Sequence, residues 1–299
     1  MNKIGQVGLL LGLAVGFSPV ADAAVGIFEH ENLVAWCIVP FDAKKRGPEQ
    51  RAAMLEGLGI KRLAYDWRAE HVPTFEAEIQ ATKAHGIELT AFWGAHEAAF
   101  GLFEKHGLKP QIWVMLPKAE APSQEERVAR AAAGILPLVE RAGKLGCPVA
   151  LYNHGGWAGE PENMIAVVKL LRERHGATHV GIVYNLHHGH DHLDRFPAAL
   201  AAMKPYLLCL NLNGMTRDGE KRGMKILPLG QGDLDLKLMR AIRDSGYRGP
   251  IGILNHTNED AEARLKDNLE GLDWLVAQLD GAPAGPKPQP RSWRPPPMQ

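Results

Sequence analysis

Histidines follow three apolar segments of this chain at the points where those segments end in asparagine. The three ends read Asn153-His154, Asn185 with His187 and His188 close behind it, and Asn255-His256. A neutral imidazole is a common metal ligand and also the usual general acid or base near neutral pH. Because short apolar runs of this kind fit buried strands, we expect the three ends to meet in one shared polar site.

The histidines have different expected roles. Those predicted to bind a metal ion are His154, His188 and His256, and two of them, His154 and His188, are also candidate proton-transfer groups. His187 should point away from His188, because side chains alternate along a strand. His190 and His192 are expected to lie at the start of the next helix, in solvent. For any one of these rings, a purely structural role is the alternative.

Asp66 is the carboxylate at a predicted strand end with the most aromatic surroundings. We predict that it acts as a catalytic base or a ligand, and a salt bridge to Arg68 is the structural alternative. Glu160 starts a helix, where the helix dipole alone favours a carboxylate. The three cysteines are odd in number and widely spaced, which indicates buried free thiols rather than a disulfide framework.

Aromatic and amide side chains near the strand ends suit a sugar, because flat rings pack on its C–H faces and amides bond its hydroxyls. The residues predicted to bind such a substrate are Arg68, Trp93, Trp113, Asn153, Trp157, Asn185, Asn211, Asn213 and Asn255. Large aromatic side chains serve mainly as buried volume, so some of the tryptophans are equally expected to fill the core. The expected partner is a small-molecule carbohydrate.

Composition limits the class of protein. The 299 residues are 45% hydrophobic and carry a formal net charge of zero, which argues against a nucleic-acid partner.

Residues 1–23 have a positive start, an apolar core and the small-residue pattern Ala21-Asp22-Ala23 of a secretory signal. We therefore expect a periplasmic or secreted protein that has no membrane contact after cleavage. The sequence assigns no oligomeric state.

Apolar runs and amphipathic segments alternate along residues 24–280 and predict an α/β fold, a single (β/α)8 TIM barrel. The expected strands are 33–39, 62–66, 87–93, 111–116, 148–153, 180–185, 207–212 and 251–254. A doubly wound sheet is the alternative, but no glycine-rich phosphate loop follows the first strand. The loop 217–229 is long and basic, and residues 281–299 form a proline-rich tail that we expect to be flexible.

The order of four segments along the chain resembles the xylose isomerase-like TIM barrel superfamily, the sugar phosphate isomerase/epimerase group related to endonuclease IV. These segments are 65–68, 153–156, 185–188 and 255–256. The resemblance implies a divalent metal ion held by three carboxylates and a histidine. At the matching positions this chain has Tyr152, Asn185, His188 and Asn255, so only His188 keeps the family's residue type.

Neutral groups at these positions should weaken the binding of a hard cation, which gains from the charge of carboxylate ligands. Either the imidazoles hold one divalent ion, Zn²⁺ or Mn²⁺, or no metal is used. The resemblance implies a sugar isomerase or epimerase that transfers a proton next to the carbonyl of a sugar or keto-sugar, and the signal pattern implies that it is exported. Our candidate catalytic groups for this reaction are His154, His188 and Asp66. The alternatives are an inactive sugar-binding barrel and a keto-sugar lyase. An endonuclease-like activity is disfavoured because the acidic ligands are missing.

Overall fold

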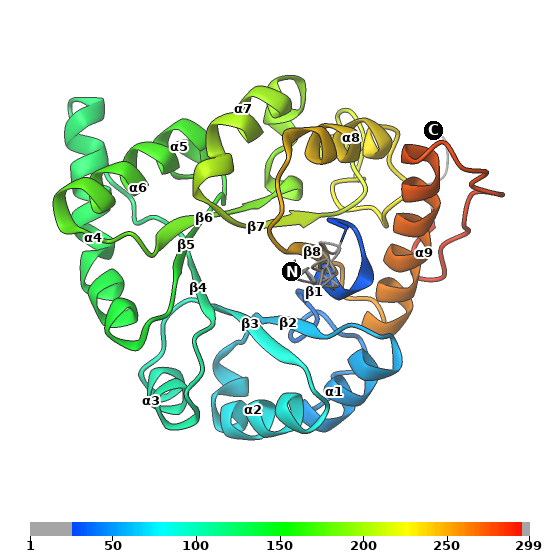
Figure 1. Cartoon of the computed structure of the whole chain (residues 1–299), viewed down its shortest axis with the longest axis horizontal. Coiled ribbons are helices and arrows are strands. Elements are labelled where there is room, and N and C mark those ends of the chain that lie inside the picture. The colour runs from blue at the N-terminus through cyan, green and yellow to red at the C-terminus, as the bar shows by residue number, and fades with distance from the viewer. Residues whose placement is uncertain (1–25, 295–299) are drawn as a thin grey trace, which may run out of the picture.

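The computed structural model describes residues 26–294, so the predicted signal at 1–23 lies outside the described residues. Eight parallel strands close into a barrel in their sequence order, which confirms the predicted TIM barrel (Figure 1). The strands are β1 (Leu33–Trp36), β2 (Arg62–Tyr65), β3 (Glu88–Trp93), β4 (Gln111–Val114), β5 (Val149–Tyr152), β6 (Val180–Asn185), β7 (Leu207–Leu212) and β8 (Ile251–Leu254).

The helices form a ring outside the strands (Figure 1). They are α1 (Pro48–Gly57), α2 (Phe75–Ala84), α3 (Glu97–His106), α4 (Gln124–Leu145), α5 (Gly156–Gly159), α6 (Pro161–His175), α7 (Phe196–Met203), α8 (Asp235–Ser245) and α9 (Ala261–Leu279). Ser123 caps the N-terminus of α4, since its Oγ accepts a hydrogen bond from the backbone N–H of Glu126 at 3.2 Å. None of the helices in the described part is long and apolar enough to cross a membrane.

The strands read as continuous apolar runs because both of their faces are covered. The outward side chains pack against the helices, and the inward ones form a separate cluster inside the barrel. That inner cluster combines two large rings, Trp36 and Trp113, with the small Ala64, Ala91 and Ala150. The rings meet edge to face with their centroids 4.7 Å apart. Alanines on the intervening strands leave the space that the two tryptophans fill.

The first strand is shorter than predicted. It was expected to reach Val39 but ends at Trp36, because Cys37 adopts a left-handed backbone conformation with φ of 60°. Such a φ is uncommon for a residue other than glycine and breaks the extended run. The segment after Trp36 therefore starts at the carboxyl end of the barrel, so that Cys37 and Phe41 reach the pocket described below.

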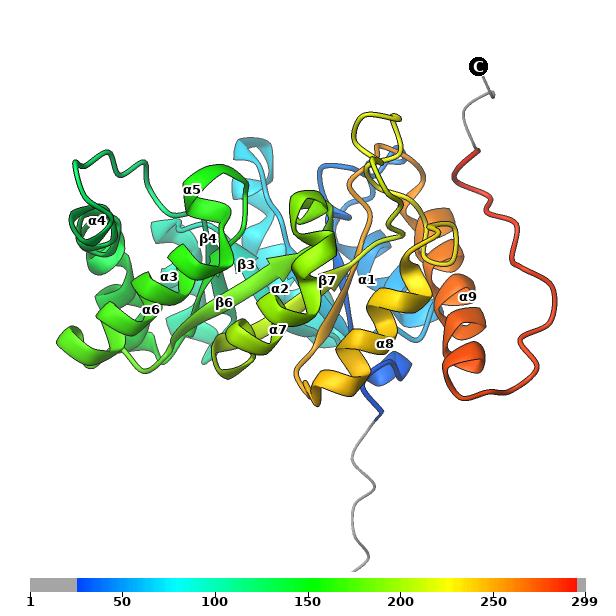
Figure 2. The ribbon, with the colours of Figure 1, turned by 90° about the horizontal axis from the view of Figure 1, so that it is seen from above.

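Residues 281–294 run along the outside of α9 (Figure 2). Arg291 contacts Asp267 at 3.1 Å and Glu270 at 2.6 Å, both on α9. The Asp267 carboxylate also accepts hydrogen bonds from the backbone N–H and the hydroxyl of Ser292. Within residues 281–294, the chain that we expected to be flexible therefore makes specific polar contacts with α9.

One buried carboxylate binds both ends of the long loop between β7 and α8. Asp235 accepts hydrogen bonds from the backbone N–H groups of Met215, Gly230 and Gly232 at 2.6, 2.8 and 3.0 Å. Both ends of the loop are thus tied to the first turn of α8. The loop stands on one side of the barrel in the side view (Figure 2).

Candidate functional site

A pocket of about 90 Å³ lies at the carboxyl ends of the strands. Its lining comes from the last residues of β1, β3 and β5, and from the segments that follow β1, β2, β5, β6 and β8. The lining residues are Trp36, Cys37, Phe41, Asp66, Arg68, Trp93, Tyr152, His154, His187, His188 and His256. Catalytic groups of TIM barrels lie at this end of the strands. The pocket is therefore the candidate active site.

Asp66 follows the last residue of β2 and is 1% exposed. Its Oδ1 accepts a hydrogen bond from the backbone N–H of Val39 at 3.3 Å, while its Oδ2 has no hydrogen-bond partner in the described part of the protein. Burial raises the pKa of this carboxyl to about 7, against the opposing effect of the Arg68 charge. A buried carboxylate with a free oxygen and a pKa near neutrality has the properties of a general base.

Arg68 does not form the salt bridge with Asp66 that was the structural alternative. Its Nη1 instead donates hydrogen bonds to the backbone carbonyls of Asp66 and Trp67, at 3.0 and 2.8 Å. The guanidinium lies 5.4 Å from the centroid of the Phe41 ring. In the described part of the chain no acidic side chain comes within ion-pair distance of Arg68.

Four imidazoles form a continuous group in the pocket. The ring centroids of His154 and His188 are 4.4 Å apart, those of His187 and His188 are 3.7 Å apart, and those of His187 and His256 are 5.7 Å apart. His187 lies deepest, at 3% exposure, whereas His154 and His256 are at the exposed rim. Three segments of sequence thus meet in one site, as their polar ends indicated.

The prediction that His187 points away from the site is wrong. It assumed that strand geometry continues past Asn185, but a short 3-10 helix, Leu186–His188, follows at once. In this turn successive side chains no longer alternate, so both rings enter the pocket. Burial, and next the neighbouring His188, lower the pKa of His187 well below its usual value. Burial and then His154 lower the pKa of His188 to about 3.

His192 is buried rather than solvated, which corrects a second expectation. Its Nδ1 is 2.8 Å from the hydroxyl of Tyr184 and its Nε2 is 3.3 Å from Glu160. Glu160 is also held by Arg195. None of these residues lines the pocket, so Glu160 has a structural role outside it. The ring of His190 bonds the backbone carbonyl of Lys225 and ties the strand ends to the long loop.

Of the tryptophans predicted to contact a sugar, Trp93 lines the pocket and two others do not. Trp113 is fully buried in the barrel, where its Nε1 donates to Gln111 at 2.9 Å. Trp157 lies on the outer surface beside α4 and packs against the guanidinium of Arg127. Trp36 lines the pocket instead, and its inward position on the first strand was the signal that the sequence offered.

The asparagines predicted to bind substrate serve the barrel itself. Asn153, Asn185, Asn211, Asn213 and Asn255 are all buried, and none lines the pocket. The Nδ2 of Asn153 donates to the backbone carbonyl of Asn185 at 3.0 Å, while its Oδ1 accepts from the backbone N–H of Asn185 at 2.7 Å. These paired bonds join the ends of β5 and β6 beyond the regular ladder.

The other three amides also satisfy backbone groups or fill close contacts. Asn213 donates to the carbonyl of Gly214 at 2.9 Å, and Asn255 donates to the carbonyl of Ala261 at 3.1 Å. Asn211 packs against β8 so closely that a Cβ at Gly252 would lie 1.8 Å from its Oδ1. Glycine is therefore required there for the two strands to pair.

The side chains at the family's metal positions do not fit a carboxylate-held cation. The Nδ2 of Asn185 donates to the hydroxyl of Tyr152, and burial raises the pKa of that phenol well above its usual value. Tyr152 is therefore neutral, and the amide of Asn255 is engaged with Ala261. The prediction of a three-histidine metal site is not met either, since within residues 26–294 no three His, Cys, Asp or Glu side chains are placed to hold one ion.

Cys37 is another pocket residue that the sequence did not single out. The three thiols are free and buried, as predicted, but Cys37 also lines the pocket beside Asp66. Burial, and next the charge of Asp66, raise the pKa of this thiol well above its usual value, so it is protonated. Its left-handed backbone is a local strain of the kind that clusters at functional sites.

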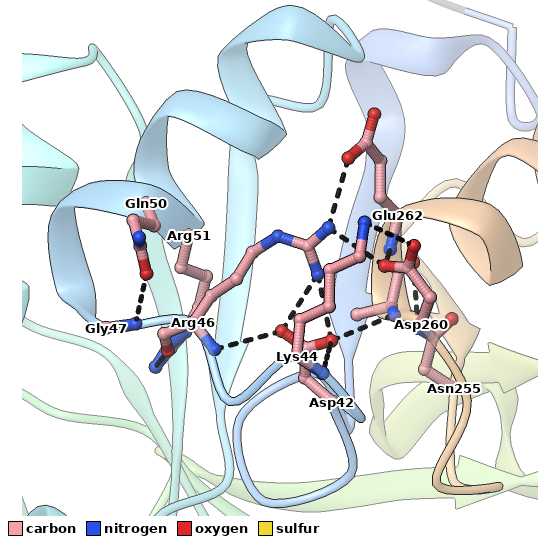
Figure 3. A network of polar contacts seen from close by, with 10 residues as sticks. Asp42, Lys44, Arg46, Gly47, Gln50, Arg51, Asn255, Asp260 and Glu262 are labelled. Carbon is pink, nitrogen blue, oxygen red and sulfur yellow. Dashed lines mark hydrogen bonds and ion pairs between the residues drawn. The ribbon is translucent and has the colours of Figure 1, made fainter.

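One arginine joins the two loops that carry Phe41 and His256, whose rings are 3.9 Å apart. Arg46 Nη1 donates to both oxygens of the buried Asp42, at 2.8 and 2.9 Å. Its Nη2 donates to Asp260 and Glu262, at 2.8 and 3.1 Å, on the loop that leads into α9 and on α9 itself. Figure 3 shows the guanidinium between these carboxylates. The network fixes one wall of the pocket.

Replacing Arg46 with methionine is expected to lower the free energy of unfolding by about 3 kcal/mol, because Asp42 would stay buried without its charged partner. Urea unfolding measures this. Lys44→Met is the matched control, since Lys44 pairs with Asp260 on the surface, where an ion pair contributes less than about 1 kcal/mol. Equal losses in the two variants would contradict the role given to Arg46.

Comparison with solved structures shows the same barrel in several sugar epimerases. The 3-keto-D-glucoside 4-epimerase YcjR of E. coli is 17% identical, with a TM-score of 0.59 over 83% of this chain and 99% of that one. D-Psicose 3-epimerase of Clostridium cellulolyticum H10, solved with D-tagatose, is 12% identical, with a TM-score of 0.57 over 83% and 99%. The IolI protein, solved with a zinc atom, is 13% identical, with a TM-score of 0.60 over 83% and 98%.

At these identities the likeness shows the shared fold. No curated protein matches the chain. Residues 62–278, which run from β2 into α9, match the family described as xylose isomerase-like TIM barrel. The match spans well over half of the chain and includes the segments on which the resemblance was first based. The chain therefore belongs to the xylose isomerase-like TIM barrel family.

Proposed function

We propose that the protein is a sugar isomerase or epimerase that moves a proton at the carbon next to a carbonyl. The observation that carries this proposal is Asp66, a buried carboxylate in the pocket with one free oxygen and a pKa raised to about 7. The family membership and the epimerases that share the fold support the same class of reaction. Because residues 1–23 have the pattern of a secretory signal, we also propose that the protein acts outside the cytoplasm.

In the proposed reaction, the ionised Asp66 takes a proton from the carbon next to the carbonyl. The electrons of the broken C–H bond form an enediolate, and negative charge develops on the carbonyl oxygen. Return of the proton to the former carbonyl carbon gives isomerisation, with the hydroxyl proton moving from the oxygen of the new carbonyl to that of the old one. Delivery of a proton to the opposite face of the same carbon gives epimerisation, and we assign this step to His154, which lines the pocket at its rim.

The histidines stabilise the enediolate as neutral donors. The pKa of His188 is about 3 and that of His187 lies well below its usual value, so both rings are uncharged at neutral pH. A neutral imidazole donates one N–H hydrogen bond, which strengthens as charge develops on the substrate oxygen. Trp36 and Trp93 supply flat apolar surfaces for the C–H faces of a sugar.

The experiment that tests the function is solvent-deuterium exchange. The protein is incubated in D2O with keto-sugars such as D-fructose and D-tagatose, and NMR follows the loss of the proton next to the carbonyl. Exchange followed by the appearance of an isomer or epimer supports the proposal. Binding of a sugar without any exchange would instead favour an inactive sugar-binding barrel, the reading that the missing carboxylates suggest. Cleavage of the carbon chain would indicate a lyase.

Dialysis against EDTA is expected to leave the rate of exchange within about twofold of the untreated protein, because neutral amides and a phenol at the family's metal positions hold a divalent cation poorly. Metal analysis of the dialysed protein accompanies the rate measurement. Loss of activity on dialysis, with recovery on adding Mn²⁺ or Zn²⁺, would show that the pocket uses a metal after all.

A further inference from the structure

The charge of the pocket is opposite to that expected for a carboxylate-held metal site. Asp66 supplies the one carboxylate among the lining residues of the described protein, and its pKa of about 7 keeps it partly protonated at neutral pH. Arg68 supplies a permanent positive charge at the same wall. The remaining titratable groups are four imidazoles, the Tyr152 phenol and the Cys37 thiol, none of which is negative at neutral pH.

The Arg68 guanidinium is held in place but not neutralised. Its Nη1 is fixed by two backbone carbonyls, and within residues 26–294 no side chain or backbone oxygen is hydrogen-bonded to its Nε or Nη2. The Phe41 ring lies beside it, with its centroid 5.4 Å from the guanidinium carbon. A cation that is oriented by the fold and has no acidic partner is arranged for an external anion.

A second polar group of the same wall also lacks a partner. His187 is 3% exposed, and its Nδ1 has no hydrogen-bond partner in the part of the chain that the structure describes. A buried polar atom of this kind costs free energy unless a ligand or water satisfies it. His187 and Arg68 are connected through two other rings. The His187 ring packs against His256, the His256 ring packs against Phe41, and Phe41 lies beside the Arg68 guanidinium. Arg68, His256 and His187 thus border one part of the pocket.

We propose that the substrate is an anionic sugar, and that its carboxylate or phosphate group binds beside Arg68, with His256 and His187 as hydrogen-bond donors. This rests on the proposed function, in which the pocket holds the substrate. A planar guanidinium with two free donors binds the oxygens of either anion in a fork, whereas a neutral sugar leaves its charge unmatched. In this arrangement the anionic group orients the sugar, and Asp66 on the same segment reaches the carbon that reacts.

Calorimetry on matched sugar pairs tests the proposal. The pairs are D-glucuronate with D-glucose and D-galacturonate with D-galactose, and D-glucose 6-phosphate distinguishes phosphate from carboxylate. We expect at least one anionic sugar to bind about tenfold or more tightly than its neutral counterpart, with an advantage that falls as salt is raised. Arg68→Gln should abolish that advantage, and Arg68→Lys should keep part of it, because the charge remains but the planar fork is lost.

Arg248→Gln is the matched control. Arg248 also donates to the backbone carbonyl of the residue before it, at 3.0 Å, but lies just before β8 at the opposite end of the barrel. It should retain the full preference for the anion. Equal affinity for the acid and the neutral sugar of each pair, absence of binding by all the anionic sugars, or a preference that survives in Arg68→Gln would overturn the proposal.

The exchange assay separates this proposal from the proposed function. If neutral keto-sugars exchange their proton and Arg68→Gln leaves KM unchanged, the catalytic proposal stands and the anion site fails. If anionic sugars bind through Arg68 but no sugar exchanges, the anion site stands and the catalytic proposal fails. The two readouts therefore report on different residues, Arg68 for binding and Asp66 for proton transfer.

Discussion

Asp66→Asn is expected to lower kcat/KM for proton exchange by about 10³-fold, because an amide cannot accept the proton that the carboxylate removes. The substitution keeps the shape of the side chain and the hydrogen bond from the backbone N–H of Val39. In the parent protein, kcat/KM should rise with pH and level off above about pH 7, where Asp66 is ionised. The residual activity of the variant should lose this rise. A variant that keeps the parent's rate or pH profile would remove Asp66 from the mechanism.

The same substitution is expected to stabilise the protein. The folded-state pKa of Asp66 is raised from 3.8 to about 7, so between these values the folded protein holds a proton that the unfolded chain has released. The contribution of Asp66 to stability therefore falls as pH rises through this window and is least favourable above pH 7. Removing the charge should have little effect near pH 4 and raise the free energy of unfolding above pH 7, on the order of 3 kcal/mol. Urea unfolding at the two pH values measures the difference.

Asp235→Asn is the matched control for both effects. Asp235 is the second buried carboxyl whose pKa burial raises to about 7, but it is remote from the lining of the active-site pocket. Both of its oxygens accept backbone N–H bonds, so an amide nitrogen would face a donor and destabilise the fold by about 1–3 kcal/mol. Asp66 has no such constraint, since its Oδ2 is unpartnered. We therefore expect Asp66→Asn to stabilise the protein and Asp235→Asn to destabilise it. Only Asp66→Asn should lose activity.

The barrel was predictable because its strands are covered on both faces and read as continuous apolar runs. Strands β6, β7 and β8 have the predicted bounds, and the others differ mainly at their ends. The largest difference, at β1, depends on the left-handed backbone of Cys37, which no pattern of hydrophobicity indicates. That one residue decides which side chains of the first loop reach the pocket.

Side-chain direction at the strand ends was less predictable. Asn153 and Asn185 were placed at the correct edge of the barrel, but neither amide faces a ligand. The amide of Asn153 bonds the backbone of Asn185, and the amide of Asn185 donates to the hydroxyl of Tyr152. An amide at a strand end can bond either the backbone of the next strand or a ligand. Which of the two it bonds depends on how close the next strand lies. His187 was misplaced because a 3-10 turn replaces the strand after Asn185. The position of a polar residue along the chain therefore locates the site, whereas tertiary contacts decide which residues enter it.

His188→Ala is expected to lower kcat by about 10²-fold with little change in KM, because its neutral N–H donor acts on charge that develops in the transition state. His188→Asn, which keeps a donor, should recover part of the loss. His190→Asn is the matched control from the next 3-10 turn, His190–Arg195, since its amide can still donate to the carbonyl of Lys225 and the His190 ring does not line the pocket. A rise in KM without a change in kcat would show that His188 binds the substrate and transition state equally. A similar loss in His190→Asn would show that the turn itself, rather than the His188 ring, supports catalysis.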